Sequence, residues 1–327
     1  MRTVILAEPG RFETGSAPEP VPGPDEALVR VHRIGVCGTD IKAYAGQQPF
    51  FSYPRILGHE LGVEVIAAPS GQDRVEVGDN CAVEPYLVCG KCHPCRVGRS
   101  NCCESLKVLG VHSDGGMRPL ICVPASTLHP SRKLSLDQLA LVETLGIGAH
   151  AVERSGIGPG RPALVVGAGP IGLTVVQFAL AAGAEVTVLE LSPQRREFVE
   201  QFGVRTLAEA DGGFYEFVFD ATGNRAAMEA SFNLVGSAGT LTFVGLIQDR
   251  VSFDDVEFHR RELNVLASRN SFGLFPQIIA AIEARRIDTR PWITARMSLD
   301  QVPARFVEVT KDPTLVKSVV ETSDADL

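Results

Sequence analysis

Residues 163–191 read ALVVGAGPIGLTVVQFALAAGAEVTVLEL, and this stretch decides the fold of the second half of the chain. Its first apolar run, up to Gly167, is typical of a buried strand, and residues 171–183 are typical of the helix that follows. Residues 185–191 supply a second strand. A strand, a tight turn, a helix and another strand in direct succession predict a βαβ unit of a parallel sheet.

The turn inside this unit matches the pattern G-x-G-x-x-G. Its first glycine allows the tight turn, its second lets the backbone approach a pyrophosphate, and its third permits close packing of the helix. The start of the helix offers unpaired N–H groups and the positive end of its dipole to the phosphates. We therefore predict a dinucleotide site that includes Gly167, Gly169, Pro170, Ile171 and Gly172.

Glu190 ends the second strand, 23 residues after Gly167. A carboxylate there accepts hydrogen bonds from the adenosine ribose and repels a 2′-phosphate, so we expect NAD rather than NADP. Arg195 and Arg196 follow closely and would soften that preference. We also expect Arg195 and Thr222 to contact the cofactor. The alternative is that Glu190 is only a solvated strand end.

Further strands are predicted near residues 214–223, 240–247 and 263–268, with a helix over residues 193–203. Strands that alternate with helices predict a doubly wound parallel sheet, a Rossmann domain, over residues 151–268. Residues 203–220 are too few for a strand, a helix and their connections. The connection between two of the parallel strands is therefore expected to be shortened in this segment.

Residues 1–150 have a different sequence pattern, in which short runs rich in β-branched residues are separated by Gly and Pro. Examples are residues 27–36, 62–68 and 79–86. Strands at this close spacing predict a β-rich domain of the partly open barrel type. The tail supplies a helix over residues 276–287, a strand over residues 293–299, and a final helix and strand. We assign residues 1–150 and 269–327 to one domain.

Length and charge narrow the class of protein. A chain of 327 residues suggests two domains, and the net charge of −8 argues against nucleic acid or an anionic membrane as a partner. The apolar stretch at residues 3–7 is too short for a signal peptide. The uncharged span 162–184 is long enough to imitate a membrane helix, but its glycines suit a strand, turn and helix better. We expect a cytoplasmic, reduced protein.

Four cysteines in the run CGKCHPCRVGRSNCC have the spacing C-x2-C-x2-C-x7-C. Such a lobe can fold around one tetrahedral Zn²⁺, and closely spaced thiols without a secretory signal indicate metal ligands rather than disulfides. The alternative, scattered core cysteines, does not explain four short gaps. A four-sulfur site is closed and therefore structural. The predicted ligands are Cys89, Cys92, Cys95 and Cys103, with Cys102 as a competitor for the fourth position.

The segments GVCGTD, YPRILGHE, the cysteine lobe, VLGVHSDGG and GAGPIG occur in an order that covers nearly the whole chain. In this order the chain resembles the zinc-dependent medium-chain alcohol and polyol dehydrogenases, close to the sorbitol, threonine and sugar-acid branch. The resemblance implies a GroES-like fold for the β-rich domain and two zinc ions per chain, one catalytic and one structural. Because relatives form dimers or tetramers, it also implies a homodimer or homotetramer.

The resemblance also implies roles for individual residues. Cys37 and His59 match ligands of the catalytic zinc, and Glu60 matches a carboxylate that enters or leaves the zinc shell. Glu143 matches the third protein position, which is a Glu in polyol-type members. Whether Glu60 or Glu143 binds zinc directly is left open by the sequence.

Two further residues near Cys37 follow from the same resemblance. Asp40 matches the carboxylate that orients the zinc-binding histidine. Thr39 matches the hydroxyl that relays the substrate proton, and at the position where many relatives have a relay histidine this chain has Lys42. Either Lys42 or water completes the relay. Such a site needs zinc with an open position, which acts as a Lewis acid on the alcohol oxygen.

For the substrate, Arg269 matches an arginine that lines the pocket in polyol and sugar-acid relatives, and Tyr44 and His112 are further candidates. Each of these three residues is equally well explained as a surface or packing residue. The sequence thus predicts an NAD-dependent, zinc-dependent dehydrogenase of a secondary alcohol, with a polyol, sugar or sugar acid as substrate.

Three alternatives remain open. The first is a dehydrogenase of simple alcohols or threonine. The second is a catalytically silent regulatory relative, against which the retention of Cys37, Thr39, His59 and the glycine turn argues. The third is a zinc-free quinone or enoyl reductase, which would need neither set of cysteines. Metal content separates the last two from an enzyme with two zinc ions per chain.

Overall fold

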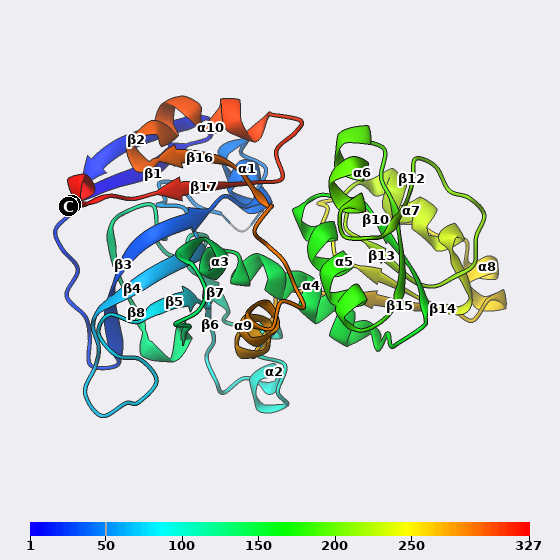
Figure 1. Cartoon of the computed structure of the whole chain (residues 1–327), viewed down its shortest axis with the longest axis horizontal. Coiled ribbons are helices and arrows are strands. Elements are labelled where there is room, and N and C mark those ends of the chain that lie inside the picture. The colour runs from blue at the N-terminus through cyan, green and yellow to red at the C-terminus, as the bar shows by residue number, and fades with distance from the viewer. Residues whose placement is uncertain (50) are drawn as a thin grey trace. The chain divides into compact units, whose positions relative to one another are not determined.

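The computed structural model describes residues 1–49 and 51–327, which form two compact units. The first unit comprises Met1–Glu143 and Phe275–Leu327, and the second comprises Thr144–Leu274. The first junction falls inside helix α4 (Val142–Ser155), which the sequence analysis did not identify. Figure 1 shows both units with their elements labelled.

The first unit is built on a seven-stranded sheet whose centre is the long strand β3 (Glu26–Gly35). The strand order is β16-β17-β3-β4-β5-β9, and β8 also pairs with β3. The further strands are β1 (Arg2–Glu8), β2 (Arg11–Ser16), β4 (Glu60–Ala67), β5 (Asn80–Val83), β6 (Tyr86–Leu87), β7 (Lys107–Val108), β8 (Leu120–Pro124), β9 (Leu128–Pro130), β16 (Ile293–Ser298) and β17 (Lys317–Glu321). The helices are α1 (Gly38–Tyr44), α2 (His93–Arg96), α3 (Leu136–Ala140), α9 (Phe275–Glu283) and α10 (Val302–Thr310).

Alternation along β3 explains how this sheet forms. Val29, Val31 and Ile34 are completely buried in the core of the unit, while intervening residues are partly exposed. Helix α3 covers β4 and comes very close to it, since a Cβ atom at Gly62 would lie 2.2 Å from the carbonyl oxygen of Leu136. The predicted β-rich domain is therefore present, and the C-terminal segment adds β16 and β17 to its sheet.

The second unit contains a six-stranded sheet in the order β12-β11-β10-β13-β14-β15, in which every pair is parallel. Helices α5, α6 and α7 pack against its strands (Figure 1). This order is that of a Rossmann fold, with the switch point between β10 and β13. The strands are β10 (Pro162–Val166), β11 (Glu185–Leu189), β12 (Arg205–Leu207), β13 (Tyr215–Asp220), β14 (Val235–Phe243) and β15 (Asn264–Ala267), and the helices are α5 (Pro170–Ala181), α6 (Pro193–Glu200), α7 (Arg225–Leu234) and α8 (Asp255–Arg260).

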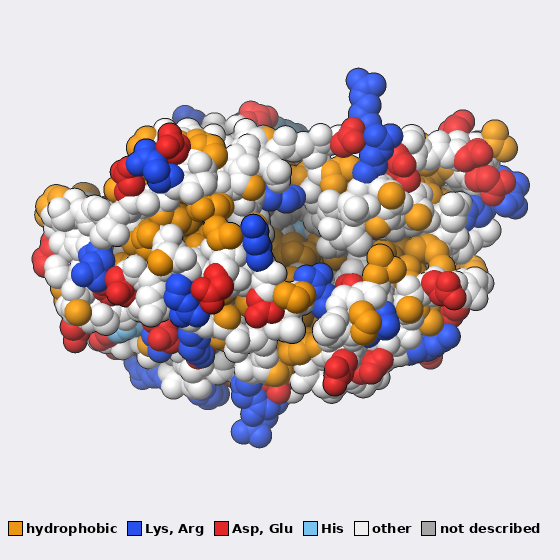
Figure 2. Space-filling model, turned by 90° about the horizontal axis from the view of Figure 1, so that it is seen from above, with side chains coloured by type: hydrophobic (Ala, Val, Ile, Leu, Met, Phe, Trp, Pro, Cys, Tyr) orange, Lys and Arg blue, Asp and Glu red, His pale blue; other side chains and the backbone are white. Residues whose placement is uncertain are grey.

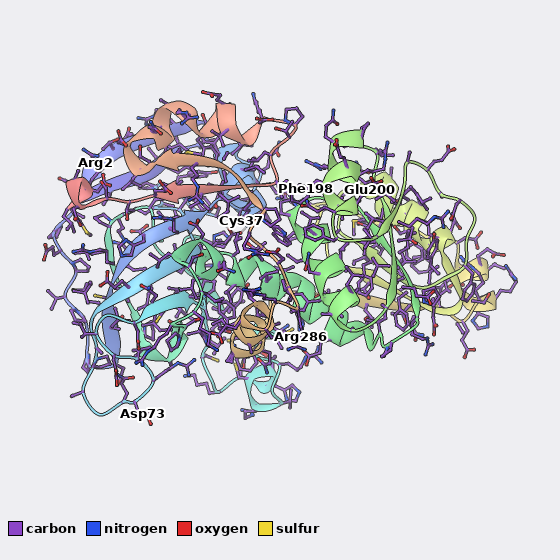
Figure 3. The ribbon with its side chains drawn as sticks, viewed as in Figure 1. Arg2, Cys37, Asp73, Phe198, Glu200 and Arg286 are labelled. Atoms are coloured by element: carbon purple, nitrogen blue, oxygen red, sulfur yellow. The ribbon has the colours of Figure 1, made fainter. Side chains whose placement is uncertain are left out.

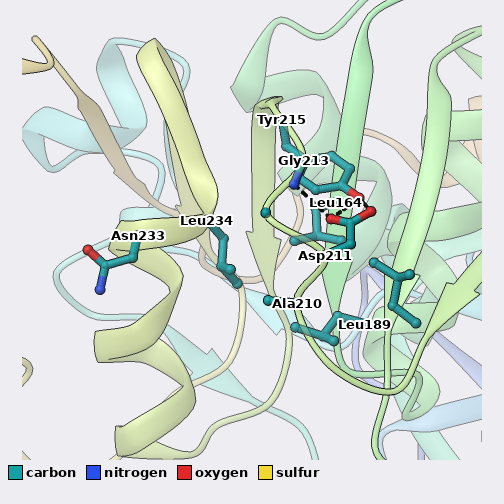
Figure 4. Close-up of a pocket in the computed structure, with 10 residues that line it drawn as sticks. Leu164, Leu189, Ala210, Asp211, Gly213, Tyr215, Asn233 and Leu234 are labelled. Carbon is teal, nitrogen blue, oxygen red and sulfur yellow. Dashed lines mark hydrogen bonds between the residues drawn. The ribbon is translucent and has the colours of Figure 1, made fainter.

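The predicted trimmed crossover lies between β12 and β13, where the connection of residues 208–214 contains no helix. Asp211 closes this connection by accepting hydrogen bonds from the Gly213 N–H at 2.9 Å and from the Tyr215 hydroxyl at 3.3 Å (Figure 4). A pocket of about 70 Å³ remains beneath it, lined by Leu164 and Leu189 among others. None of the predicted site residues lines this pocket, so it is a packing gap left by the missing helix.

Acidic and basic side chains are interspersed over the face seen in Figure 2, without a field of one sign. Within residues 1–49 and 51–327, no helix is long and apolar enough to cross a membrane. The uncharged span that begins at Pro162 forms β10, the glycine turn and α5, as predicted.

Packing of α4 against α5 generates a first prediction. A Cβ atom at Gly148 in α4 would lie 2.3 Å from Thr174 Oγ1 and 2.4 Å from the Thr174 carbonyl carbon. Gly→Ala in an open helix stabilises by up to about 1 kcal/mol, but overpacking destabilises by about 1–3 kcal/mol. We expect Gly148→Ala to destabilise the protein in chemical denaturation, whereas Gly158→Ala, with no atom within 4 Å, serves as the control. An unchanged denaturation midpoint in Gly148→Ala would contradict this packing.

Candidate functional site

The predicted catalytic metal ligands come together where β3 ends and β4 begins. Cys37 is the N-cap of α1, two residues after β3, and Figure 3 labels it. His59 and Glu60 stand at the start of β4, and Glu60 pairs with Gly35 across the ladder. One potential ligand atom from each of Cys37, His59 and Glu60 lies within 4.8 Å of the others. Because β3 and β4 are adjacent and antiparallel, residues far apart in sequence meet at one end of the sheet.

Glycine at position 35 makes room for the Glu60 side chain. A Cβ atom there would lie 2.1 Å from Glu60 Oε2, so no other residue leaves space for this carboxylate. On the other side, Glu60 Oε1 accepts a hydrogen bond from Lys317 Nζ at 2.6 Å. Both side chains are buried, with 1% and 3% exposed. The position of the Glu60 carboxylate is thus set by β3 below it and by β17 beside it.

Glu143 has a separate partner. Its Oε1 accepts a hydrogen bond from the Tyr86 hydroxyl, and both residues are buried. Burial and the nearby Glu143 charge raise the pKa of Tyr86 well above its ordinary value, so the phenol keeps its proton and donates it. Burial also raises the pKa of Glu143, against the pull of His59. Tyr86 therefore orients Glu143.

Asp40 lies behind His59, as the resemblance implied. Its Oδ2 accepts a hydrogen bond from the Cys37 N–H at 2.9 Å, and its Oδ1 lies 3.8 Å from His59 Nδ1. Burial lowers the pKa of His59, but Asp40 and Cys37 outweigh it, so the net pKa rises well above the ordinary value. Asp40 thus draws Nδ1 toward itself and leaves Nε2 as the ring nitrogen available for a metal.

The residues at this position fit a zinc ion. Asp40 Oδ1 and His59 Nδ1 are buried and have no hydrogen-bond partner. Buried polar atoms without partners are rare, and a cation bound at this position would account for them. The candidate ligands combine one thiol, one imidazole and a carboxylate, a set that zinc accepts in catalytic sites. Buried carboxylates are costly without a compensating cation, so a divalent ion would stabilise the group as a whole.

The cysteine lobe forms a second cluster, with the sulfur atoms of Cys89, Cys92, Cys95 and Cys103 gathered within 4.8 Å. The Cys92 sulfur lies 3.4 Å from that of Cys95 and 3.8 Å from that of Cys103. Cys103 is buried, whereas Cys102 is exposed and outside the cluster. The structure thus favours Cys103 over Cys102 for the fourth position.

Charge also indicates a cation within the lobe. The backbone N–H groups of Lys91 and Cys92 lower the pKa of Cys89 to about 6, whereas burial raises the pKa of Cys95 to about 11. Sulfur atoms packed so closely cannot all ionise unless a positive ion joins them. The Cys89 N–H donates to Cys103 Sγ at 3.3 Å, an amide–sulfur bond that orients a thiolate ligand.

The glycine turn of the second unit has the geometry that the motif predicts. Gly167 has φ +95°, which L side chains rarely adopt. A Cβ atom at Gly172 would lie 1.8 Å from the Gly167 carbonyl oxygen, so α5 could not approach the turn with any other residue there. At Gly169, the N-cap of α5, the nearest atom to an added Cβ is Arg195 Nη1 at 4.0 Å. Pro170 and Ile171 open the helix, and the Arg195 guanidinium stands beside its N-terminus.

Glu190 is buried rather than solvated, so the alternative reading of a solvated strand end is wrong. Its Oε2 accepts a hydrogen bond from the Ala168 N–H at 2.7 Å, and its Oε1 accepts one from the Ser192 N–H at 2.8 Å. The carboxylate therefore joins the glycine turn to the start of α6. Each oxygen keeps a second lone pair for a ribose hydroxyl.

A residue that the sequence analysis missed supports Thr222. Asp220, the last residue of β13, accepts hydrogen bonds from both the N–H and the hydroxyl of Thr222 through Oδ1 and from the Ser231 hydroxyl through Oδ2. Burial raises the pKa of this carboxyl, and the three donors oppose that rise. Asp220 thereby fixes the turn after β13, at the strand end where dinucleotides bind.

The predicted substrate and relay residues have varied surroundings. The Tyr44 ring packs against the rings of Phe12 and Phe306, and its hydroxyl donates to the Gly10 carbonyl at 2.7 Å. His112 is exposed and accepts a hydrogen bond from the Val108 N–H through Nδ1. Three further predicted residues are Thr39, half-buried in α1, Lys42, exposed in α1, and Arg269, exposed after β15.

Comparisons with known proteins agree with this architecture. The alcohol dehydrogenase GroES-like domain matches residues 23–133, and the zinc-binding dehydrogenase domain matches residues 170–284. L-galactonate-5-dehydrogenase of Escherichia coli K12 is 41% identical over 284 residues, which cover 83% of this chain and 84% of that enzyme.

Solved structures are similar over almost the full length. An alcohol dehydrogenase of Escherichia coli CFT073, crystallised with NADH, is 26% identical with a TM-score of 0.93, covering 98% of this chain and 99% of that one. A zinc-binding dehydrogenase of Sinorhizobium meliloti 1021, bound to NADP, is 29% identical with a TM-score of 0.90 and covers 98% of both chains.

Fold and site together define an oxidoreductase of alcohols with a GroES-like and a Rossmann domain, which confirms the predicted fold class. The chain belongs to the zinc-dependent medium-chain dehydrogenase family. The match to the zinc-binding dehydrogenase domain and the identity to L-galactonate-5-dehydrogenase favour a zinc-dependent enzyme over the regulatory and zinc-free alternatives.

The cysteine lobe generates the second prediction. Cys95→Ser removes one sulfur from the cluster, and because structural zinc binding contributes folding free energy, we expect the melting temperature to fall by more than about 5 °C. Zinc content should drop by one ion per chain in metal analysis. Cys102→Ser is the matched control, since Cys102 is exposed beside the cluster. Equal melting temperatures and zinc contents in the two variants would exclude a structural metal in the lobe.

Proposed function

We propose that the chain is an NAD-dependent, zinc-dependent dehydrogenase that oxidises a secondary hydroxyl group of a sugar acid or polyol. The observation that carries this proposal is the convergence of Cys37, His59 and Glu60 within 4.8 Å, with Glu143 held by Tyr86 and Asp40 behind His59. We assign the catalytic role to the unit of Met1–Glu143 and Phe275–Leu327, and cofactor binding to Thr144–Leu274.

Within the first unit, Cys37, His59 and one of the two carboxylates hold the zinc, which acts as a Lewis acid toward the substrate hydroxyl when bound. Asp40 keeps His59 Nε2 directed at the metal position. Thr39, one residue into α1, accepts the hydroxyl proton at its Oγ1. Either Lys42 in the same helix or a water molecule then accepts the proton from Thr39 as a general base and passes it to solvent.

Within the second unit, the glycine turn and the N-terminus of α5 hold the pyrophosphate, and Arg195 adds a positive charge beside Gly169. Glu190 accepts the adenosine ribose hydroxyls. Two backbone N–H groups hold the Glu190 carboxylate in place. Its negative charge repels the 2′-phosphate of NADP, which favours NAD. The bound cofactors of the two similar structures, NADH and NADP, make this preference a matter for measurement.

For the substrate, we propose a sugar acid, an aldonate whose secondary hydroxyl near the far end of the chain is oxidised. The support is the 41% identity to L-galactonate-5-dehydrogenase over 84% of that enzyme. Arg269 is the proposed partner for the substrate carboxylate, since a guanidinium binds carboxylates in a bidentate manner.

The test is a substrate panel with purified protein at constant pH. Aldonates, polyols, simple secondary alcohols and L-threonine are each supplied with NAD, and reduction is followed by absorbance. Highest kcat/KM with an aldonate supports the proposal. A preference for simple alcohols or threonine would move the assignment to those classes, and no turnover with two zinc ions bound would contradict catalysis altogether.

The third prediction concerns the catalytic zinc. Cys37→Ser should remove one zinc ion per chain and reduce kcat/KM by at least 100-fold, an effect of about 2.7 kcal/mol on the transition state. The lobe is a separate cluster, so the second zinc ion and the circular dichroism spectrum should remain. Cys81→Ser is a control, because Cys81 is a cysteine of the same unit outside both clusters. Full zinc content and turnover in Cys37→Ser would place the catalytic metal elsewhere.

The fourth prediction concerns Glu190. Glu190→Ser removes the ribose acceptor and the negative charge, so kcat/KM with NAD should fall tenfold to about a hundredfold, the equivalent of about 1.5–3 kcal/mol. Rejection of NADP should relax, helped by Arg195 and Arg196. Steady-state kinetics with both cofactors measures the ratio.

Two controls separate charge from structure at this position. Glu190→Gln keeps the shape and one acceptor for the backbone N–H groups of Ala168 and Ser192 but loses the charge, and Glu197→Ser removes a charge from the exposed face of α6. Only the Glu190 variants should shift the ratio. A wild type that already prefers NADP, or a ratio unmoved by Glu190→Ser, would show that Glu190 does not read the ribose.

A further inference from the structure

The connection between β12 and β13, residues 208–214, contains no helix. Parallel strands are ordinarily joined through a helix, which also covers the sheet beside them. Here a pocket of about 70 Å³ remains beneath the connection, lined by Leu189 of β11 and Leu207 of β12 among others. The seven residues of the connection therefore take the place of a covering helix.

Strand β12 depends on this connection because it has few other restraints. It is the outermost strand of its sheet and is only three residues long, Arg205–Leu207. In the described part of the chain it pairs with β11 alone. Helix α6 adds a hydrogen bond, which the Thr206 hydroxyl donates to Glu200. A short strand at a sheet edge opens more easily than a central strand.

The side chain of Asp211 fastens the connection to both strands. Its Oδ2 lies 3.0 Å from Arg205 Nη2 in β12, and its Oδ1 accepts a hydrogen bond from the Gly213 N–H at 2.9 Å. Both oxygens lie 3.3 Å from the hydroxyl of Tyr215, the first residue of β13 (Figure 4). The Gly213 N–H, more than any other group, lowers the pKa of Asp211, so the carboxyl is ionised.

The hydrogen bonds to Asp211 matter more than its ion pair. Arg205 is 62% exposed, and an ion pair with so exposed a partner stabilises little. Tyr215 is buried, and hydrogen bonds to an ionised acceptor are stronger than those between neutral groups. Asp211 thus holds the two ends of the connection together from the inside.

Strand β12 in turn holds the strand end that carries Glu190. The carbonyl of Leu207, the last residue of β12, accepts a hydrogen bond from the Glu190 N–H at 3.0 Å. The Glu190 carboxylate then accepts the Ala168 N–H of the glycine turn. Contacts therefore run without interruption from Asp211 through β12 to the group that accepts the adenosine ribose in the proposed function.

We infer that Asp211 is a positioning residue for the cofactor site, which keeps β12 closed against β11 so that Glu190 stays in place to accept the ribose. The inference rests on the proposed dinucleotide site. If β12 opens, the fraction of chains that can bind cofactor falls, and the apparent dissociation constant rises in proportion. A cofactor that binds only the closed form must in return stabilise β12.

The test measures NADH binding to the purified full chain by fluorescence titration. Asp211→Ala removes all three contacts, and we expect the dissociation constant for NADH to rise at least threefold. In steady-state kinetics with an aldonate, KM for NAD should rise by a similar factor. The value of kcat should stay within twofold, because saturating cofactor closes β12 again. Simple loss of folded protein would instead lower kcat and leave KM unmoved.

Companion variants separate positioning from general damage. Asp211→Asn keeps an acceptor for the Gly213 N–H and the Tyr215 hydroxyl and should recover most of the affinity. Tyr215→Phe removes one donor and should weaken NADH binding by less than Asp211→Ala. The two changes combined should cost no more than Asp211→Ala alone, because they act on one network. Glu209→Ala is the matched control, since it removes an exposed carboxylate from the same connection.

A second readout needs no substitution. Hydrogen exchange followed by mass spectrometry should show that saturating NADH slows exchange of the backbone amides of residues 205–215 at least fivefold. Residues 293–298, which form β16 in the first unit, serve as the reference segment. This measurement stands even if Asp211→Ala fails to fold.

Three outcomes would overturn the inference while leaving the proposed function intact. These are NADH binding to the wild type with an unchanged dissociation constant in Asp211→Ala, an equal effect of Glu209→Ala, or exchange of residues 205–215 that NADH does not slow. Failure of the proposed function looks different. The wild-type chain would then bind neither NADH nor NADPH, and the role of Asp211 would fall with it.

Discussion

Three carboxylates, those of Asp40, Glu60 and Glu143, are buried near one another in the first unit, and their mutual repulsion is the constraint that shapes this region. In a medium of low dielectric constant, such charges are tolerated only with compensating cations and donors. A different hydrogen-bond donor serves each carboxylate: the Cys37 N–H donates to Asp40, Lys317 to Glu60, and Tyr86 to Glu143. The ends of β3, β4 and β17 are placed where these pairs can form.

Features of the fold and site could be predicted from the sequence when the residues that form them lie close together in the chain. The glycine turn and the cysteine lobe were found because their residues lie within one turn or one short loop, where spacing alone fixes geometry. The parallel sheet and its trimmed crossover followed from apolar runs and from the short segment before Asp220. Ligand candidates at Cys37, His59 and Glu143 came from resemblance, since nothing local in their surroundings marks them.

Lys317, Tyr86 and Asp220 escaped the sequence analysis for a physical reason. Lys317 becomes significant only when β17 pairs with β3, and a lysine before a β-branched run is otherwise indistinguishable from a solvated strand start. Tyr86 meets Glu143 across 57 positions. Helices α4 and α7 were also missed, although Asn224 caps the start of α7 by accepting a hydrogen bond from the Ala227 N–H. Tertiary pairing, rather than local propensity, decides each of these cases.

The first unit is interrupted in sequence by the whole of the second, and this has a consequence for biosynthesis. Chains emerge from the ribosome from the N-terminus, and domains tend to fold as units as they appear. Cys37, His59 and Glu60 are translated early, yet β17 with Lys317 follows only after residues 144–274. A nascent chain thus exposes these candidate metal ligands before the first unit is complete, at a stage when the Rossmann sheet can already form. The Glu60 carboxylate therefore lacks its Lys317 partner until the C-terminal segment has been translated.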